Sequence, residues 1–110
     1  MTGLATVSNP AGTRFETRLV NYLLTKGFPY AERRARNGKK DRGDLSGIPG
    51  ICVEAKAVKR IALAEWMDEA VTEQENAGAQ LTYVIFPRKN HHIGRAYVLC
   101  ELDQWIEEHR

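Results

Sequence analysis

The chain has 110 residues, a formal net charge of +2 at pH 7 and 43% hydrophobic residues. This length suits a single compact domain, and the composition is ordinary for a globular protein. No apolar run is long enough to span a membrane, and the N-terminus lacks the layout of a signal peptide, so we expect a cytoplasmic protein with no membrane partner. The two cysteines, Cys52 and Cys100, lie in apolar runs and are typical of buried thiols in a reducing compartment.

The first predicted element is a helix over residues 13–26, which Gly27 is placed to end. Residues 1–12 indicate a flexible leader, because Pro10 and its neighbours interrupt regular structure. We therefore take 13–110 as one domain. The apolar stripe of this helix consists of Phe15, Leu19, Tyr22 and Leu23.

Three strands are expected next, with a basic loop at 37–43 between the first and the second. They span residues 28–36, 44–46 and 51–58. The segment Ile48-Pro49-Gly50 separates the last two strands, and its proline and glycine stand where a type II turn favours them. Strand 51–58 is rich in β-branched and small residues.

The second half of the chain predicts two helices and two strands, namely helix 62–77, strands 81–86 and 95–100, and helix 101–108. The apolar stripe of helix 62–77 consists of Leu63, Trp66, Met67, Ala70, Val71 and Gln74. The residues expected to point away are Glu65, Asp68, Glu69, Thr72, Glu73 and Glu75. The order α-β-β-β-α-β-β-α predicts an α/β or α+β domain, with a mixed central β-sheet flanked by helices.

Positive charge is concentrated in the first half of the chain. Residues 1–60 hold twelve Lys or Arg against five acids, whereas residues 61–110 hold four against nine. The densest basic cluster consists of Arg33, Arg34, Arg36, Lys39, Lys40 and Arg42. Such a cluster favours a polyanionic partner bound through phosphate contacts, although a solvated loop remains the alternative.

The segment 43–57, GDLSGIPGICVEAKA, places two acids and a lysine in an otherwise small and apolar run. Glu54 and Lys56 share one face of the predicted strand, and the turn would fold Asp44 back beside the start of that strand. Close carboxylates repel each other, and a divalent cation such as Mg²⁺ or Mn²⁺ would resolve the conflict and activate a water. Alternatively, Glu54 and Lys56 are a surface pair and Asp44 is a turn residue.

Two further polar residues are candidates for the same site. Glu16 fits a capping box with Thr13, and it could also lean over the metal from the first helix. Gln74 lies on the apolar stripe of helix 62–77. It is either a helix-end residue half out of the core or a residue that orients a water or Lys56.

These motifs together resemble the PD-(D/E)XK nuclease superfamily, and within it the Holliday-junction resolvases of the archaeal type and of bacteriophages. The matching segments run in the family's order over about residues 12–86. They are G-T-R-F-E (12–16), K-G-F (26–28), G-D-L (43–45), V-E-A-K (53–56) and the helix that bears Gln74. Gly43 stands where the motif that names the family has proline.

The resemblance implies a restriction-endonuclease-like core and a homodimeric, Mg²⁺-dependent endonuclease that acts on branched DNA. It implies that Asp44, Glu54 and the Ala55 carbonyl bind the metal. Lys56 would assist the nucleophile, with Glu16 as the additional acid and Gln74 as a further site residue. The DNA contacts it implies are Thr13, Arg14, Arg33, Arg34, Arg36, Lys39, Lys40 and Arg42. A dimer is expected because a four-way junction must be cut on two strands.

Two other functions stay open at this point. A nuclease with the same core could act on flaps, nicks or linear duplexes. A non-catalytic DNA-binding module would bind with a steep salt dependence and would not cleave in Mg²⁺. The intact set of Asp44, Glu54 and Lys56 argues against the second alternative.

Overall fold

The computed structural model describes residues 10–35 and 42–110. In chain order its elements are α1 (Pro10–Thr25), β1 (Glu32–Arg33), β2 (Leu45–Ser46), β3 (Ile51–Ala55), α2 (Leu63–Ala77), β4 (Leu81–Phe86), the short 3₁₀-helix η1 (Ile93–Arg95), β5 (Tyr97–Leu99) and α3 (Leu102–His109). Among the described helices, none is long and apolar enough to cross a membrane.

The centre of the fold is a three-stranded sheet in the order β3-β4-β5. β3 and β4 run parallel and are joined by α2, while β4 and β5 run antiparallel. A parallel pair needs a long crossover connection, which explains why a whole helix separates these two strands. β1 and β2 form a separate antiparallel ladder. The mixed α+β fold expected from the sequence is therefore confirmed.

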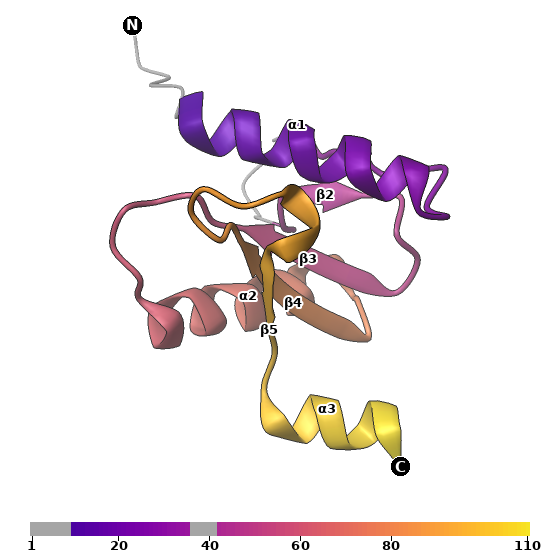
Figure 1. Ribbon diagram of the computed structural model, residues 1–110. Coiled ribbons are helices and arrows are strands. Elements are labelled where there is room, and N and C mark those ends of the chain that lie inside the picture. The colour runs from indigo at the N-terminus through magenta and orange to yellow at the C-terminus, as the bar shows by residue number, and fades with distance from the viewer. Residues whose placement is uncertain (1–9, 36–41) are drawn as a thin grey trace, which may run out of the picture.

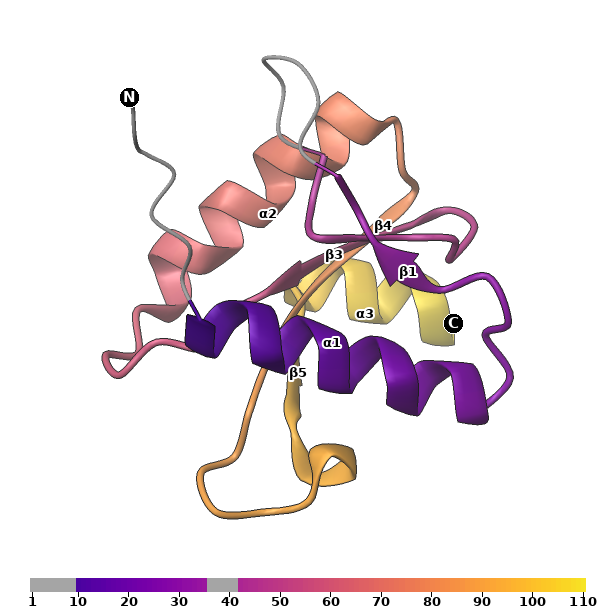
Figure 2. The same cartoon turned by 90° about the horizontal axis from the view of Figure 1, so that it is seen from above.

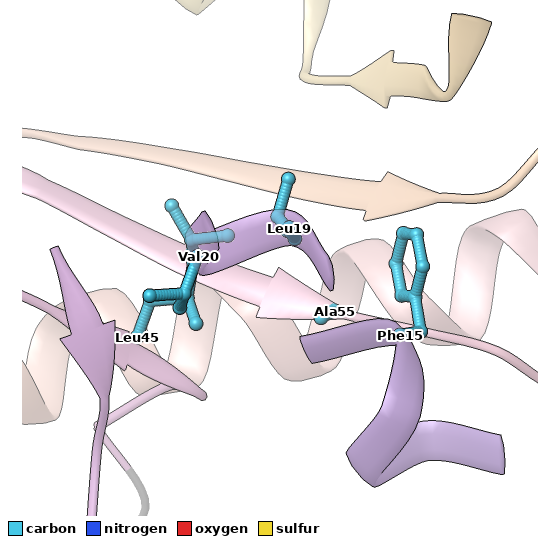
Figure 3. Close-up of a cluster of buried hydrophobic side chains, with 6 residues drawn as sticks. Phe15, Leu19, Val20, Leu45 and Ala55 are labelled. Carbon is cyan, nitrogen blue, oxygen red and sulfur yellow. The ribbon is translucent and has the colours of Figure 1, made fainter. Parts of the chain in front are cut away.

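Helices cover both faces of this sheet (Figure 1). α1 lies on one side, and α2 and α3 lie on the other, as the view from above also indicates (Figure 2). The core on the α1 side is formed by Phe15, Leu19, Val20, Leu45, Val53 and Ala55, most of which Figure 3 labels. A second cluster on the α2 side consists of Trp66, Met67, Ala70 and Val84. The sheet thus has an apolar layer on each face.

The first helix begins at Pro10, earlier than the sequence predicts. Proline suits the first turn because its missing N–H would have no partner there, and its fixed φ is already helical. Thr13 and Glu16 therefore lie inside the helix, and the predicted capping box is wrong. Residues 1–9 of the predicted leader lie outside the described residues.

The long strand expected over 28–36 is reduced to Glu32–Arg33. Both residues are exposed and pair only with Leu45–Ser46, so no buried face extends the strand. The strand expected over 95–100 also shortens, because the His92 side chain accepts a hydrogen bond from the Gly94 N–H (3.0 Å) and helps to close η1 instead. The expected strand 81–86 is confirmed residue for residue.

The turn that leads into β3 forms as predicted. The Ile51 N–H donates to the Ile48 carbonyl at 3.1 Å, and Gly50 has a φ of +76°. This positive φ at the third position is the signature of a type II turn. The turn reverses the chain so that the residues around β2 run back alongside β3.

Candidate active site

The hairpin brings Asp44 against the far end of β3. The Asp44 N–H donates to the Val53 carbonyl at 2.8 Å, and its carboxylate Oδ2 accepts from the Ala55 N–H, also at 2.8 Å. The sequence placed Asp44 beside the start of this strand, so the register is corrected by several residues. The juxtaposition with Glu54 that it predicted is present, because the two carboxyl groups share a hydrogen bond.

Gly43 explains why the motif lacks proline here. Its φ is +94°, and an added Cβ would lie 3.0 Å from the Val53 carbonyl oxygen. Proline is fixed at a φ near −65° and cannot adopt this conformation. Glycine is therefore what allows Asp44 to approach β3 so closely.

Glu54 is a buried acid with few partners. Its residue is 3% exposed, and its Oε1 has no hydrogen-bond partner among the described residues. Burial, then the hydrogen bond with Asp44, and then the negative charges of Asp44 and Glu73 raise the pKa of Glu54 to about 10. In the protein without metal this carboxyl group is therefore protonated near neutral pH. A bound cation would stabilise its ionised form and displace the proton.

Two acids of α2 that the sequence analysis assigned to the outward face complete the cluster. Glu73 is buried, and Glu54, Glu69 and Glu73 each offer an oxygen that lies within 4.8 Å of the others. A signal for Glu73 was present, since Trp66, Ala70 and Glu73 follow the i, i+4, i+7 spacing of one helical face. The apolar stripe expected from Leu63 to Gln74 passes beside Glu73, which left this acid on the face expected to point outward.

Lys56 lies between β3 and α2 and contacts two of these acids. Its Nζ is 3.4 Å from Glu54 Oε2, and 3.3 and 3.2 Å from the two carboxylate oxygens of Glu69. Burial alone would lower the pKa of Lys56, but Glu54 and Glu69 outweigh it and raise the pKa. Both acids lie within ion-pair distance of Lys56 Nζ, and Glu69 also accepts hydrogen bonds from it. Lys56 is thus an ammonium ion, suited to orient a phosphate or water and not to accept a proton.

The backbone of β3 adds one more oxygen. The Lys56 N–H donates toward β4, to the Ile85 carbonyl at 3.0 Å, whereas the Ala55 N–H points to Asp44. The N–H and C=O of one strand residue point to the same edge, so the Ala55 carbonyl lies on the side of Asp44. The carboxyl groups of Asp44 and Glu54, the latter with its unpartnered Oε1, and the Ala55 carbonyl form an all-oxygen set that fits Mg²⁺ or Mn²⁺.

The structure does not bring Glu16 and Gln74 into the acid cluster. The Arg33 Nε donates to Glu16 Oε1 at 3.1 Å, which joins α1 to β1. The Gln74 Nε2 donates to the carbonyls of Ala79 (3.3 Å) and Gln80 (3.0 Å) and closes the turn after α2. Gln74 therefore has the helix-end role that the sequence left open as an alternative.

Arg34 is joined to the site through the backbone of Asp44. Its N–H donates to the Asp44 carbonyl at 2.8 Å, and its Nε is buried with no hydrogen-bond partner in the described part of the chain. Burial raises the pKa of Cys52 to about 11, and the nearby Arg34 charge acts in the opposite direction. Since Cys52 shares a strand face with Glu54, this charge lies close to the acids.

The other predicted DNA contacts are dispersed or lie outside the description. Arg14 and Arg42 are exposed, and Thr13 is half-buried. Arg33 is held by Glu16, with its side chain 47% exposed. Arg36, Lys39 and Lys40 lie outside the described residues.

Comparisons of this chain with protein-family models, with curated proteins and with solved structures found no match. The function is therefore inferred from the geometry of the cluster and from the motifs that place its residues. In that geometry, the β2–β3 hairpin and α2 bring their carboxyl groups together beside Lys56.

Proposed function

We propose that the chain is a metal-dependent DNA endonuclease that hydrolyses phosphodiesters in branched DNA, with four-way junctions as its substrate. The proposal rests on one observation. The carboxyl groups of Asp44 and buried Glu54 meet beside the ammonium group of Lys56, and Glu54 Oε1 has no hydrogen-bond partner among the described residues. An arrangement that raises a carboxyl pKa this far is unfavourable for folding and is typical of functional sites.

The proposed cofactor is Mg²⁺, for which Mn²⁺ can substitute. Asp44, Glu54 and the Ala55 carbonyl would hold it, because all three are hard oxygen donors that meet at the end of β3. Such an ion supplies an activated water and neutralises charge on the phosphate. Glu73 is as buried as Glu54, and its negative charge contributes to the raised pKa of Glu54.

The remaining roles follow from charge and position. Lys56 is held as an ammonium ion by Glu69 and would orient the scissile phosphate or the attacking water. Arg34, anchored through its N–H to the Asp44 carbonyl, would contact a phosphate oxygen next to the scissile one. The product would carry a 5′-phosphate, as in the nucleases that the motifs resemble.

The proposed partners are DNA and a second copy of the chain. Residues 1–60 contain twelve basic residues and only five acids, which supports a polyanionic ligand. The preference for a junction rests on the resemblance of the motifs, and it implies two active sites that act on two strands. We place the reaction in the cytoplasm, where Cys52 and Cys100 would stay reduced.

The test is cleavage of a labelled synthetic four-way junction, with duplex, nicked and flap substrates of the same sequence, in Mg²⁺ and in EDTA. We expect paired nicks in the junction that EDTA abolishes. Asp44→Asn should abolish cleavage but keep binding, because an asparagine oxygen can still accept the Ala55 N–H. Glu65→Gln is the matched control, since Glu65 is an exposed acid outside the cluster.

Other outcomes select the alternatives. Equal cleavage of every substrate would retain the nuclease and remove the junction preference. Tight, salt-sensitive binding without cleavage in Mg²⁺ or Mn²⁺ would replace the proposal with a DNA-binding module. An Asp44→Asn variant that cuts at the wild-type rate would remove Asp44 from the metal site.

A further inference from the structure

Helix α3 presents its apolar stripe away from the domain. Leu102, Trp105 and Ile106 follow the i, i+3, i+4 spacing of one helical face, and all three are exposed. A surface helix normally turns such a stripe toward the core. Helix α3 does the reverse, which leaves three large apolar side chains in contact with solvent.

The inward face of α3 is polar, and specific hydrogen bonds attach it to the sheet. The Gln104 side chain accepts from the Thr82 N–H at 2.9 Å and donates to the Thr82 carbonyl at 3.0 Å. It therefore mimics a strand residue at the point on β4 where β5 has already ended. Glu108 adds a hydrogen bond from the Tyr83 hydroxyl. These bonds fix the orientation of the helix, so its apolar stripe is held on the outward side.

Strand β5 continues this surface. It is the last strand in the order β3-β4-β5, and no strand in the described part of the chain pairs with its outer edge. Tyr97 and Val98 are exposed, Val98 to 61%. An open edge strand beside apolar side chains is a template for pairing with another chain.

We propose that this surface, formed by β5 and the outward stripe of α3, binds a second copy of the same chain. The two β5 strands would pair antiparallel about a two-fold axis near Val98. In such a pair, residues after Val98 lie opposite residues before it, so the start of α3 faces segment 88–95 of the partner subunit. Asp103 is the acid in the first turn of α3, while segment 88–95 contains Arg88, Lys89 and Arg95. This opposite charge favours a second copy over an unrelated protein.

The pairing has a consequence for the proposed active site. A two-fold axis between antiparallel strands is perpendicular to the sheet, so both copies present the same face to the same side. The sheet would run β3-β4-β5 and then β5-β4-β3, which separates the two Glu54 residues by five strand spacings, or about 24 Å. Two sites on one face suit the cutting of two strands. That use rests on the proposed nuclease function, whereas the surface itself does not.

The test measures self-association of the full chain by sedimentation equilibrium, without DNA or metal. Val98→Lys places a charge on the edge strand, and Trp105→Lys places one on α3. Ile61→Lys is the control, because Ile61 is as exposed as Val98, at 62%, but lies before α2. We expect dimers for the wild type and Ile61→Lys, and at least an about tenfold weaker dimer for each of the other variants. Circular dichroism shows whether each variant is folded. If Val98→Lys does not fold, Trp105→Lys still tests the surface.

A charge exchange tests the partner's identity more closely. Arg95→Glu should weaken the dimer, and adding Asp103→Lys should restore part of the affinity because the two charges are exchanged. A wild-type chain that stays monomeric, or a dimer unaffected by Val98→Lys and Trp105→Lys, would overturn the proposal. Since these measurements contain no DNA, either result leaves the proposed nuclease function to its own test.

Discussion

The two faces of β3 have opposite compositions. Val53 and Ala55 are buried against α1 in an apolar cluster, whereas Glu54 and Lys56 point to α2 and meet further acids. Side chains of a strand alternate, so the four consecutive residues 53–56 supply both faces. One short strand thus contributes to the stability of the fold on one side and to an energetically unfavourable cluster of acids on the other.

The difference predicts opposite responses to substitution. Truncation on the α1 side removes buried apolar contacts and should lower the free energy of unfolding. Neutralisation on the α2 side relieves burial of charge and repulsion, so it should raise that free energy while removing the proposed activity. A substitution on the α1 side that abolishes cleavage without lowering stability, or one on the α2 side that lowers stability, would show that the two faces are not separate in function.

The largest effect is expected from Glu54→Gln. Loss of a metal ligand should reduce the rate of junction cleavage by about 10³-fold or more. The same variant should be more resistant to urea than the wild type in EDTA, because its neutral amide needs no proton to stay buried. Parallel cleavage assays and urea titrations test both parts. A variant that loses activity and stability together would contradict this explanation.

On the apolar face, Phe15→Ala should lower the free energy of unfolding by about 3–5 kcal/mol. Phe15 is buried in the cluster with Val53 and Ala55 and lies away from the acids. Leu24→Ala, at an exposed position of the same helix, is the control and should change stability by less than about 1 kcal/mol. Cleavage per folded molecule should remain, as measured at a temperature where the variant is folded.

The pH dependence of stability provides a third test. The pKa of Glu54 is about 10 in the folded protein and near 4.5 in the unfolded chain, so between these values the folded state holds the extra proton. The free energy of unfolding in EDTA should therefore fall as pH rises, by up to about 1.4 kcal/mol per unit. Urea titrations at several pH values measure the slope. It should flatten in Glu54→Gln and in excess Mg²⁺, and an equal slope in all samples would refute the assignment.

The smallest effect is expected from Glu69→Gln. Glu69 is 45% exposed, so its ion pair with Lys56 contributes little to stability. Without it, the pKa of Lys56 should decrease, and the pH at which cleavage is lost on the alkaline side should decrease with it. Cleavage rates across alkaline pH test this expectation, with Glu65→Gln as the control. An unchanged pH profile would show that groups other than Glu69 raise the pKa of Lys56.

The hairpin was predictable because its determinants are local. A type II turn and strand alternation suffice to bring Asp44 beside a strand that carries Glu54, although the register required the hydrogen bonds to Val53 and Ala55. The position of Glu73 was missed because acids are usually solvated, and only the packing of α2 on the sheet shows that this one is buried.

The inverted orientation of α3 could not be read from the sequence either. Leu102, Trp105 and Ile106 have the spacing of an ordinary core stripe. The bonds of Gln104 to Thr82, which turn the other face inward, depend on where β5 ends. Such contacts are set by tertiary structure and leave no periodic signal.

The proposed metal site is tested most directly by Mn²⁺ binding, measured by electron paramagnetic resonance on the wild type, Asp44→Asn and Glu54→Gln without DNA. If the buried acids of the β2–β3 hairpin hold a metal, the wild type binds Mn²⁺, both variants lose most of that affinity, and all three remain folded. Equal binding by folded variants, or no binding by the wild type at the concentrations that nucleases require, would contradict the claim.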